Sequence, residues 1–388
     1  MIIAGVNQFK ESSLEKMLTS IVEVGGTLLT PTVSLCPECV YHIPAYKYYK
    51  DNSVYMVKCC VFHGISHHLI ETDYEFYAKY DGYHLSQTHN FNAIVHIEGS
   101  DRCNLECPHC YHLPDNKIID VPKSDLIDQI KRWPLGVEQV ILAGAESSLR
   151  KDFTELVADI SGLGFTPGIL TNGIRFGDPD FLKESLSAGL VTVNVGLNHP
   201  EYNNYEKVRT KQVRAIEMLS NSDAIIGYIS YTMINLSELD YILNEITTNK
   251  WNAYTYRIRG GSEIGRNGSE VRPYLSDIWK AVRDWCIRNN KSFESIDHAD
   301  DSLYHVMAMV DGKELRLIQW CDITDIDMEN LRSGPWCNFT PGPITNFLHQ
   351  VIVRDQWKNK NKILPDLAPS RYCFAVEPVN EPLDLLKL

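Results

Sequence analysis

The sequence predicts an α/β fold: a partial (βα)6 TIM-like barrel that follows a small β-rich N-terminal module and precedes an irregular C-terminal extension. Three observations support this prediction. From residue 90 onward, short β-rich segments alternate with amphipathic helical segments, which is typical of a parallel sheet built from βα units. Residues 1–90 differ, because they are rich in Tyr, His and Cys and contain few helical periods. After about residue 300 the alternation ends.

The predicted barrel contains six βα repeats. Its strands are expected at residues 91–97, 139–142, 166–170, 191–197, 224–233 and 251–258. Its helices are expected at residues 123–132, 153–163, 181–188, 208–219, 236–247 and 273–288. Residues 306–310 and 314–320 predict a hairpin around Asp311-Gly312, followed by a tail rich in Pro and Trp. We therefore expect domains at residues 1–90, 91–300 and 301–388.

Composition limits the class of protein. Hydrophobic residues make up 44% of the 388 residues and charged residues 22%, which excludes a largely disordered or fibrous chain. The net charge of −13 argues against a nucleic-acid partner, because phosphates attract basic surfaces. No segment approaches the roughly 18 apolar residues of a membrane span, and the N-terminus lacks a signal-peptide pattern, so we expect a cytoplasmic protein. The eleven cysteines, mostly clustered, suit metal binding in a reducing compartment.

The most informative motif is a C-x3-C-x2-C loop directly after the first predicted barrel strand, formed by Cys103, Cys107 and Cys110. Three thiolates at this spacing can bind three irons of a cubane [4Fe-4S] cluster, and the fourth iron then has no protein ligand in this segment. A zinc knuckle or three unrelated buried thiols is the alternative, but structural zinc prefers four ligands. The loop therefore predicts a cluster with one open iron.

This loop resembles that of the radical S-adenosylmethionine (SAM) superfamily, in which SAM chelates the open iron through its amino and carboxylate groups. The resemblance implies that one electron from the cluster cleaves the sulfonium and that the resulting 5′-deoxyadenosyl radical abstracts hydrogen from a substrate inside the barrel. It also implies a position near adenine for His109, although the family usually has an aromatic residue there.

Two further segments resemble SAM-binding motifs of the same family. Ala143-Gly144-Ala145-Glu146, after the second strand, is similar to the GGEP segment that binds the SAM amino group, with alanine for one glycine. Serine follows Glu146 where proline is usual. At the end of the third strand, Thr171-Asn172-Gly173 is similar to the TNG turn beside the ribose. The resemblance thus assigns Gly144, Glu146, Thr171 and Asn172 to SAM.

Two strands carry polar residues at a spacing of two, so that those of each strand share one face. Asn194 and Asn198 lie on the fourth strand, where SAM hydroxyls or carboxylate, or else loop backbone, would satisfy their amides. Arg257 and Arg259 lie on the sixth strand. One of these arginines could bind the SAM carboxylate or an anionic substrate, or both could be solvated.

The N-terminal module contains a second metal motif. Cys36 and Cys39 form one C-x2-C pair, and Cys60 and His63 form a C-x2-H pair, which together offer four ligands for zinc or a rubredoxin-like iron. Cys59 is adjacent to Cys60, and we prefer Cys60 because of its spacing to His63. Reduced cysteines without a metal are the alternative interpretation.

The knuckle followed by the barrel resembles one group in particular, which includes archaeal pterin-methylating and tetraether-lipid-forming radical SAM enzymes. Those relatives make carbon–carbon bonds at unactivated positions and carry extra iron sites. In the C-terminal extension, Cys321, Cys337 and Cys373 could bind an auxiliary iron–sulfur cluster, although they could also be isolated buried thiols.

We therefore expect a radical SAM enzyme that methylates, couples or rearranges a small or lipid-like metabolite, with an external one-electron donor such as flavodoxin or ferredoxin. Three alternatives remain open at this point. The target could be a tRNA or a peptide, SAM could be cleaved differently to transfer its 3-amino-3-carboxypropyl group, or the protein could be a non-catalytic iron–sulfur and zinc protein.

Overall fold

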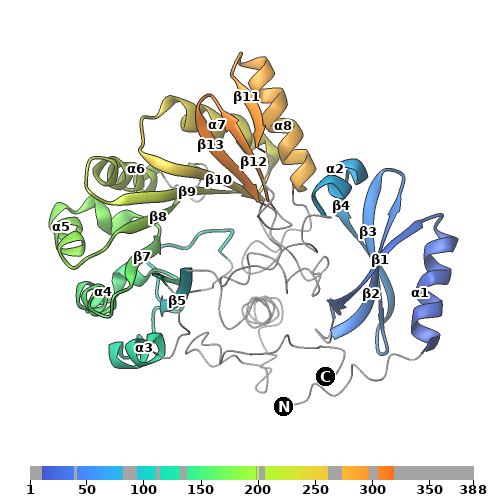
Figure 1. The fold of residues 1–388 in the computed structure, drawn as a ribbon, viewed down its shortest axis with the longest axis horizontal. Coiled ribbons are helices and arrows are strands. Elements are labelled where there is room, and N and C mark those ends of the chain that lie inside the picture. The colour runs from blue at the N-terminus through green and yellow to red at the C-terminus, as the bar shows by residue number, and fades with distance from the viewer. Residues whose placement is uncertain are drawn as a thin grey trace.

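The computed structural model describes residues 11–38, 42–81, 94–110, 114–131, 138–197, 199–200, 206–260, 273–296 and 305–318. The described residues form two sheets, a small antiparallel one and a large, mostly parallel one, which lie on opposite sides of the molecule (Figure 1). None of the described helices is long and apolar enough to cross a membrane.

The small sheet belongs to the N-terminal module. Its four antiparallel strands are paired in chain order: β1 (Thr27–Leu35), β2 (His42–Lys50), β3 (Ser53–Cys60) and β4 (Gly64–Glu71). Helix α1 (Glu11–Glu23) covers one face, where its Met17 and Ile21 pack against Tyr48, Val57 and Cys59. Helix α2 (Tyr74–Asp81) follows the last strand.

The large sheet has nine strands in the order β11-β12-β13-β10-β9-β8-β7-β6-β5. Six strands in chain order are parallel: β5 (Ile94–Ser100), β6 (Gln139–Gly144), β7 (Thr166–Thr171), β8 (Thr192–Leu197), β9 (Ile225–Met233) and β10 (Ala253–Gly260). Strand β13 (Lys313–Ile318) adds in parallel beside β10. Strands β12 (His305–Val310) and β11 (Phe293–Ile296) then continue the sheet in antiparallel fashion.

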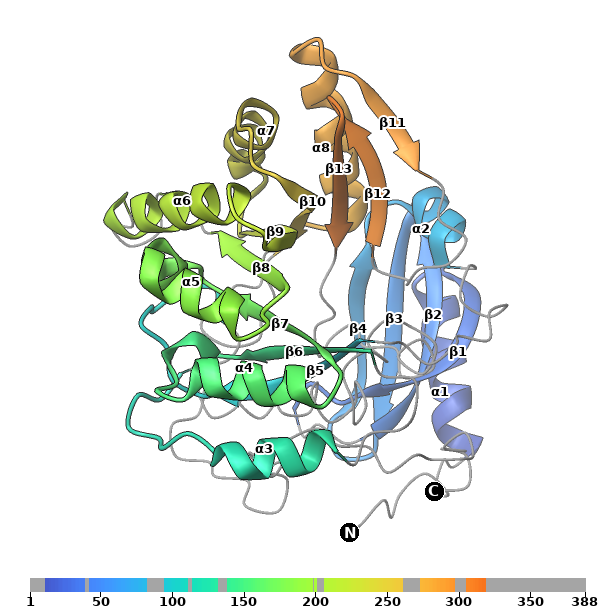
Figure 2. The same cartoon turned by 60° about the vertical axis from the view of Figure 1, so that its left-hand side comes forward.

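Helices cover the outer face of this sheet, as Figures 1 and 2 show. They are α3 (Lys123–Ile130), α4 (Phe153–Gly162), α5 (Pro179–Ser187), α6 (Glu206–Ser220), α7 (Leu239–Thr248) and α8 (Leu275–Arg288). Short 3-10 helices occupy Ser147–Leu149, Ile174–Gly177 and Leu236–Glu238. One continuous apolar core fills the space between helices and sheet, and alternate residues of each strand point into it.

The predicted partial (βα)6 barrel and the N-terminal β-rich module are confirmed. Each predicted barrel strand and helix has a counterpart within a few residues of its expected bounds. Among the described strands, β5 and β11 are the two edges of the large sheet, so the barrel stays open. The predicted terminal hairpin is also present as β12 and β13, and the structure adds that it extends the main sheet. The predicted tail after residue 318 lies outside the described residues.

Candidate functional site

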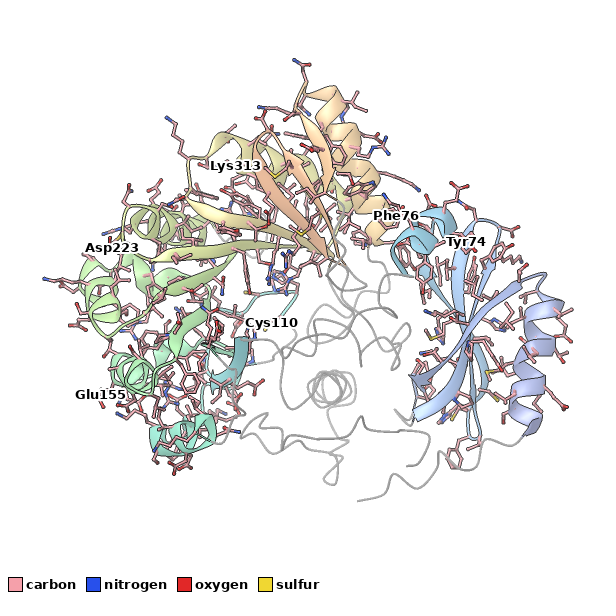
Figure 3. All side chains as sticks on the ribbon, in the orientation of Figure 1. Tyr74, Phe76, Cys110, Glu155, Asp223 and Lys313 are labelled. Carbon is pink, nitrogen blue, oxygen red and sulfur yellow. The ribbon has the colours of Figure 1, made fainter. Side chains whose placement is uncertain are left out.

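The cysteine triplet lies on the loop that leaves the carboxyl end of β5. Cys103, Cys107 and Cys110 are each half-buried, and Figure 3 shows Cys110 on the inner side of the large sheet. The backbone N–H of Cys110 donates to the Cys107 carbonyl at 3.2 Å, and Asn116 accepts from the backbone N–H of Cys103 at 3.0 Å. These bonds hold the loop in a compact turn.

The Cys103 thiol is largely buried and lies within range of the charges of the other two cysteines. Burial raises the pKa of Cys103 to about 12, with smaller contributions from the charges of Glu146, Cys107 and Cys110. A structural zinc ion takes four protein ligands, whereas three thiolates on one loop leave one iron of a [4Fe-4S] core open. The donor set therefore fits such a cluster better than a lone zinc ion.

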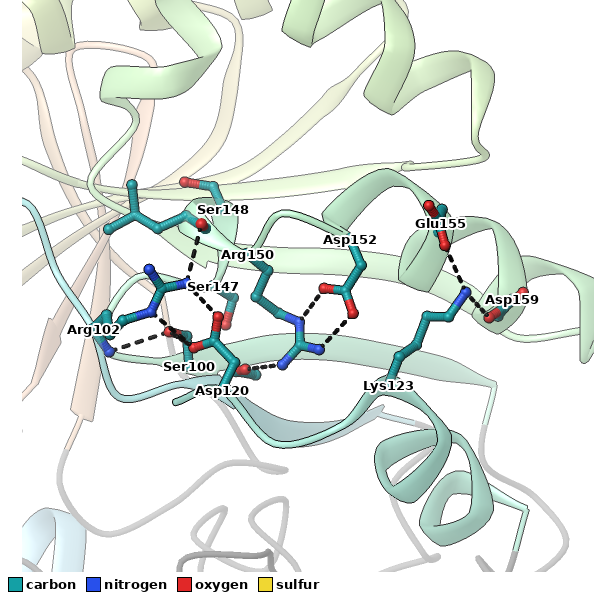
Figure 4. A network of polar contacts seen from close by, with 12 residues as sticks. Ser100, Arg102, Asp120, Lys123, Ser147, Ser148, Arg150, Asp152, Glu155 and Asp159 are labelled. Carbon is teal, nitrogen blue, oxygen red and sulfur yellow. Dashed lines mark hydrogen bonds and ion pairs between the residues drawn. The ribbon is translucent and has the colours of Figure 1, made fainter. Parts of the chain in front are cut away.

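A partly buried ionic network fixes this loop against the next one (Figure 4). Arg102 forms an ion pair with Asp120, which also accepts a hydrogen bond from Ser100 at 2.6 Å. Arg150, 2% exposed, donates to the Gly99 carbonyl at 2.8 Å and to both carboxylate oxygens of Asp152 at 2.9 Å. A guanidinium group that donates two parallel hydrogen bonds to one carboxylate is fixed in orientation, because the two bonds define a plane. Sequence reasoning assigned no structural role to either arginine.

Gly144 lets the segment after β6 approach the cysteine loop. Its φ of +99° lies in the region that favours glycine, and a Cβ at this position would come within 2.6 Å of the Ser100 carbonyl oxygen. The backbone N–H of Ala145 donates a hydrogen bond to this same Ser100 carbonyl oxygen at 2.8 Å. Any other residue here would push the two loops apart.

Glu146 ties the ends of β6 and β7 together. Its carboxylate is 1% exposed and accepts hydrogen bonds from the Ser148 hydroxyl at 2.5 Å, the Thr171 hydroxyl at 2.7 Å and the backbone N–H of Asn172 at 2.7 Å. Burial raises the pKa of this carboxyl group, although the three donors oppose the shift. The carboxylate that the resemblance assigns to SAM thus has three donors from its own chain.

The Asn172 turn stands directly beside the cysteine loop. Its Nδ2 donates to the Asn104 Oδ1 at 2.8 Å and lies 3.9 Å from the Cys103 sulfur. Gln212, fully buried on α6, donates to the carbonyls of both Asn172 and Gly196 at 2.9 Å. Gln212 therefore joins the ends of β7 and β8, a role that nothing in its sequence position indicated.

Polar residues on the inner faces of β8, β9 and β10 continue the site. The buried Asn194 accepts a hydrogen bond from the backbone N–H of Tyr228 at 3.1 Å, so backbone satisfies its oxygen. The Arg257 guanidinium stacks over the Tyr228 ring at 3.5 Å, and Arg259 donates to the Thr232 hydroxyl at 2.7 Å. His109 is half-buried within the cysteine loop, and Asn198 lies outside the described residues.

The knuckle residues meet at the turn between β3 and β4. Ligand atoms of Cys36, Cys60 and His63 lie within 4.8 Å of one another, with the His63 Nδ1 3.4 Å from each sulfur. Burial opposes ionisation of Cys60, but hydrogen bonds from the Phe62 and His63 backbone and from the His63 and Cys36 side chains lower its pKa to about 7. Two thiols and an imidazole at this spacing suit zinc.

Cys59 faces the other way, into the apolar cluster under α1, because adjacent strand residues point to opposite faces. The geometry thus favours Cys60 over Cys59 as the ligand. Cys39, the fourth predicted ligand, lies outside the described residues, as do Cys321, Cys337 and Cys373 of the predicted auxiliary cluster.

Comparison with known proteins agrees with this arrangement. Residues 97–242 match the radical SAM superfamily, and residues 28–72 match the HMPTM N-terminal zinc ribbon domain. The 7,8-dihydro-6-hydroxymethylpterin dimethyltransferase of Methanocaldococcus jannaschii is 27% identical over 190 residues, which cover 42% of this chain and 38% of that protein. The GTP 3',8-cyclase of Aquifex aeolicus is 32% identical over 164 residues, 38% of this chain and 45% of that enzyme.

These matches span less than half the length of either relative. A crystal structure of Streptococcus suis SuiB bound to S-adenosylmethionine aligns at a TM-score of 0.42 and 15% identity, covering 60% of this chain and 51% of that one, a likeness too low to carry an argument. The two family matches show that this chain contains a radical SAM domain preceded by an HMPTM N-terminal zinc ribbon domain.

Proposed function

We propose that this protein binds SAM at a [4Fe-4S] cluster held by Cys103, Cys107 and Cys110, and uses it to functionalise a C–H bond of a small-molecule substrate. The observation that carries the proposal is the half-buried triplet at the carboxyl end of β5, with the Asn172 amide 3.9 Å from the Cys103 sulfur. Ligands of parallel α/β sheets bind at this end of the strands.

Residues at the ends of β6, β7 and β8 have separate roles in positioning the cluster and SAM. When bound, the cluster and SAM supply one-electron reductive cleavage of a carbon–sulfur bond. Asn172 orients the cluster loop through Asn104, and Glu146 acts as a positioning residue that sets the Thr171-Asn172 turn. Gly196 is exposed on the inner face of β8 and leaves room there for part of the SAM molecule.

Among the reactions that such a radical could start, we favour methylation or carbon–carbon bond formation. It is supported by the 27% identity to the pterin dimethyltransferase of M. jannaschii over 190 residues, and by the match of residues 28–72 to the HMPTM N-terminal zinc ribbon domain. A pterin-like heterocycle is the first substrate class to test. The net charge of −13 weighs against a nucleic-acid target. An external one-electron donor, such as a flavodoxin or ferredoxin, belongs to the same proposal.

Spectroscopy of the reduced, iron-reconstituted protein tests the binding step. Added SAM should change the electron paramagnetic resonance signal of the cluster, because SAM becomes a ligand of one iron. A Cys107→Ser variant should lose the cluster and the effect, while a Cys286→Ser variant, altered in the core under α8, should keep both. An unchanged wild-type signal contradicts SAM ligation. The SAM that is cleaved keeps its methyl group on the methionine product, so methylation needs a second donor. SAM with a deuterated methyl group then tests whether a second SAM molecule is that donor, by transfer of mass to a pterin.

A further inference from the structure

Three arginines share the inner face of the large sheet on two neighbouring strands. Arg257 and Arg259 lie on β10, and Arg316 lies on β13. Each alternates with buried residues that belong to the core beneath the helices, namely Tyr256, Ile258, Leu315 and Leu317. Since successive side chains of a strand point to opposite faces, the guanidinium groups point to the inner side.

The strand register places Arg257 and Arg316 in one row with the proposed SAM site, and Arg259 lies two residues further along β10. Arg257 is the register partner of Arg316 on one side and of Ser230 on the other, and Ser230 is the partner of Gly196. The row therefore runs across the sheet from Gly196 on β8 to Arg316 on β13. Neighbouring strands are about 4.8 Å apart, so Arg257 and Arg316 lie about 10 Å and 14 Å along the row from Gly196.

The other end of the row borders the cysteine loop. Gly196 is exposed, and the nearest atom to a Cβ built there is the Thr171 carbonyl oxygen at 3.8 Å. The Gln212 side-chain amide donates to the backbone carbonyls of both Gly196 and Asn172. The side-chain amide of Asn172 in turn lies 3.9 Å from the Cys103 sulfur. A molecule lying along this row would have one end beside the cluster loop and the other at the arginines.

The positive charge of Arg257, Arg259 and Arg316 favours an anionic ligand at their end of the row. Among the described residues, β10 and β13 bring three cations and one acidic side chain, Glu314, to this face. A dianion between two guanidinium groups at paired register positions can accept hydrogen bonds from both. Phosphoryl oxygens also match the arginine fork, which donates two parallel hydrogen bonds. A lone carboxylate offers half the charge and fewer acceptors.

Neighbouring side chains hold two of the arginines in place. Stacking on Tyr228 at 3.5 Å sets the plane of the Arg257 guanidinium, and the Thr232 hydroxyl accepts from Arg259 at 2.7 Å. Fixed cations bind an anion with less loss of side-chain entropy than mobile ones. We propose that Arg257, Arg259 and Arg316 bind a phosphoryl group of the substrate, at the far end of the row from the SAM site. This inference rests on the proposed function, because it concerns the substrate of that same site.

Equilibrium binding of pyrophosphate to the full, metal-loaded protein under anaerobic conditions tests the proposal without requiring turnover. Wild type should bind pyrophosphate more tightly than the dicarboxylate glutarate. Arg316→Gln should weaken pyrophosphate binding about tenfold or more, as expected for lost hydrogen bonds to a charged group, and Arg316→Lys should weaken it less. Arg283→Gln, which removes an exposed arginine from α8, serves as the matched control and should bind like wild type.

Four results overturn the proposal: wild type that does not bind pyrophosphate, glutarate that binds more tightly, an equal loss in the Arg283→Gln control, or an Arg316→Gln variant that loses SAM and pyrophosphate affinity alike. The last result assigns the arginine to SAM instead. If Arg316→Gln does not fold, Arg257→Gln takes its place under the same criteria. Failure to cleave SAM would refute the proposed function but leaves this binding measurement intact, so the two failures are distinguishable.

Discussion

Glu71 and Ser276, 205 residues apart in the chain, join the zinc-ribbon module to the radical SAM domain. The Glu71 carboxylate, 3% exposed, accepts from the Ser276 hydroxyl at 2.5 Å and from its backbone N–H at 3.3 Å. It therefore caps the first turn of α8 from another module, a role that the side chain of Tyr274, the residue before this helix, does not fill. Beside it, Lys280 and Asp73 form an ion pair at 2.7 Å.

Replacing Glu71 should destabilise the protein. Glu71→Ala leaves the Ser276 donors without their acceptor in a buried place, which costs about 1–3 kcal/mol of the free energy of unfolding. Glu75→Ala, on the exposed side of α2, removes a carboxylate of the same type and should change stability by less than about 0.5 kcal/mol. Chemical denaturation of both variants checks this difference, and equal losses contradict the capping role.

The same residue predicts a pH dependence. Burial raises the pKa of Glu71, so the folded state holds this proton at pH values where the unfolded chain has released it. Its contribution to stability is therefore fully present below the ordinary Glu value of 4.5 and declines as pH rises toward the folded pKa. The stability difference between wild type and Glu71→Gln should shift in favour of the glutamine variant as pH rises. A difference that shifts the opposite way contradicts the raised pKa.

Two adjacent cysteines test the metal knuckle. Cys60→Ser removes a sulfur 3.4 Å from His63 and should lose the bound zinc, measured as metal per purified chain. Cys59→Ser should keep the zinc, because this residue packs under α1, and should lower the melting temperature instead. Zinc lost from Cys59→Ser but kept by Cys60→Ser reverses the assignment.

Gly144 tests the close approach of the two loops. Gly144→Ala combines a φ of +99° with a contact of 2.6 Å to the Ser100 carbonyl oxygen, so the cysteine loop must move. We expect less iron per chain after reconstitution and a loss of SAM cleavage. Gly162→Ala, which meets no atom within 4 Å, is the matched control and should reconstitute like wild type. Full iron loading of Gly144→Ala contradicts the account.

Arg150 tests the network beneath the cluster loop. Arg150→Gln removes the fork to Asp152 and the bond to the Gly99 carbonyl from a buried position, and should cost about 1–3 kcal/mol, as the loss of hydrogen bonds at a buried group does. Arg288→Gln breaks an exposed pair with Asp240 and should cost less than about 1 kcal/mol. Thermal and denaturant melts measure both, and similar losses contradict a special role for Arg150.

Most strands and helices of the barrel were predictable from the sequence, because each βα unit has its own hydrophobic pattern within a short segment. The six strands are apolar runs, and their helices have an amphipathic period, so alternation alone placed them. Helix α1 was missed although Leu14, Met17 and Ile21 recur at helical spacing, because the surrounding Tyr- and Cys-rich composition suggested only strands. The short α2 has a weaker pattern and depends on packing of Phe76 against Trp279 of α8. Figure 3 shows Phe76 where α2 meets α8.

The candidate site was predictable where its residues are close in sequence. Spacing identified the cysteine triplet and the Cys60 and His63 pair, since a single loop or turn carries each set. Glu71, Gln212 and Arg316 escaped notice because their roles depend on register and on contacts between segments far apart in the chain. Strand alternation combined with the pairing of β13 and β10 would have been needed to find Arg316.

Release of 5′-deoxyadenosine from SAM tests the central claim most directly. Anaerobically reconstituted wild type, given SAM and a one-electron reductant, should release it, and Cys107→Ala should release none above the rate without protein. A fully iron-loaded wild type that releases no 5′-deoxyadenosine, or a Cys107→Ala variant that matches it, would contradict SAM cleavage at the loop after β5.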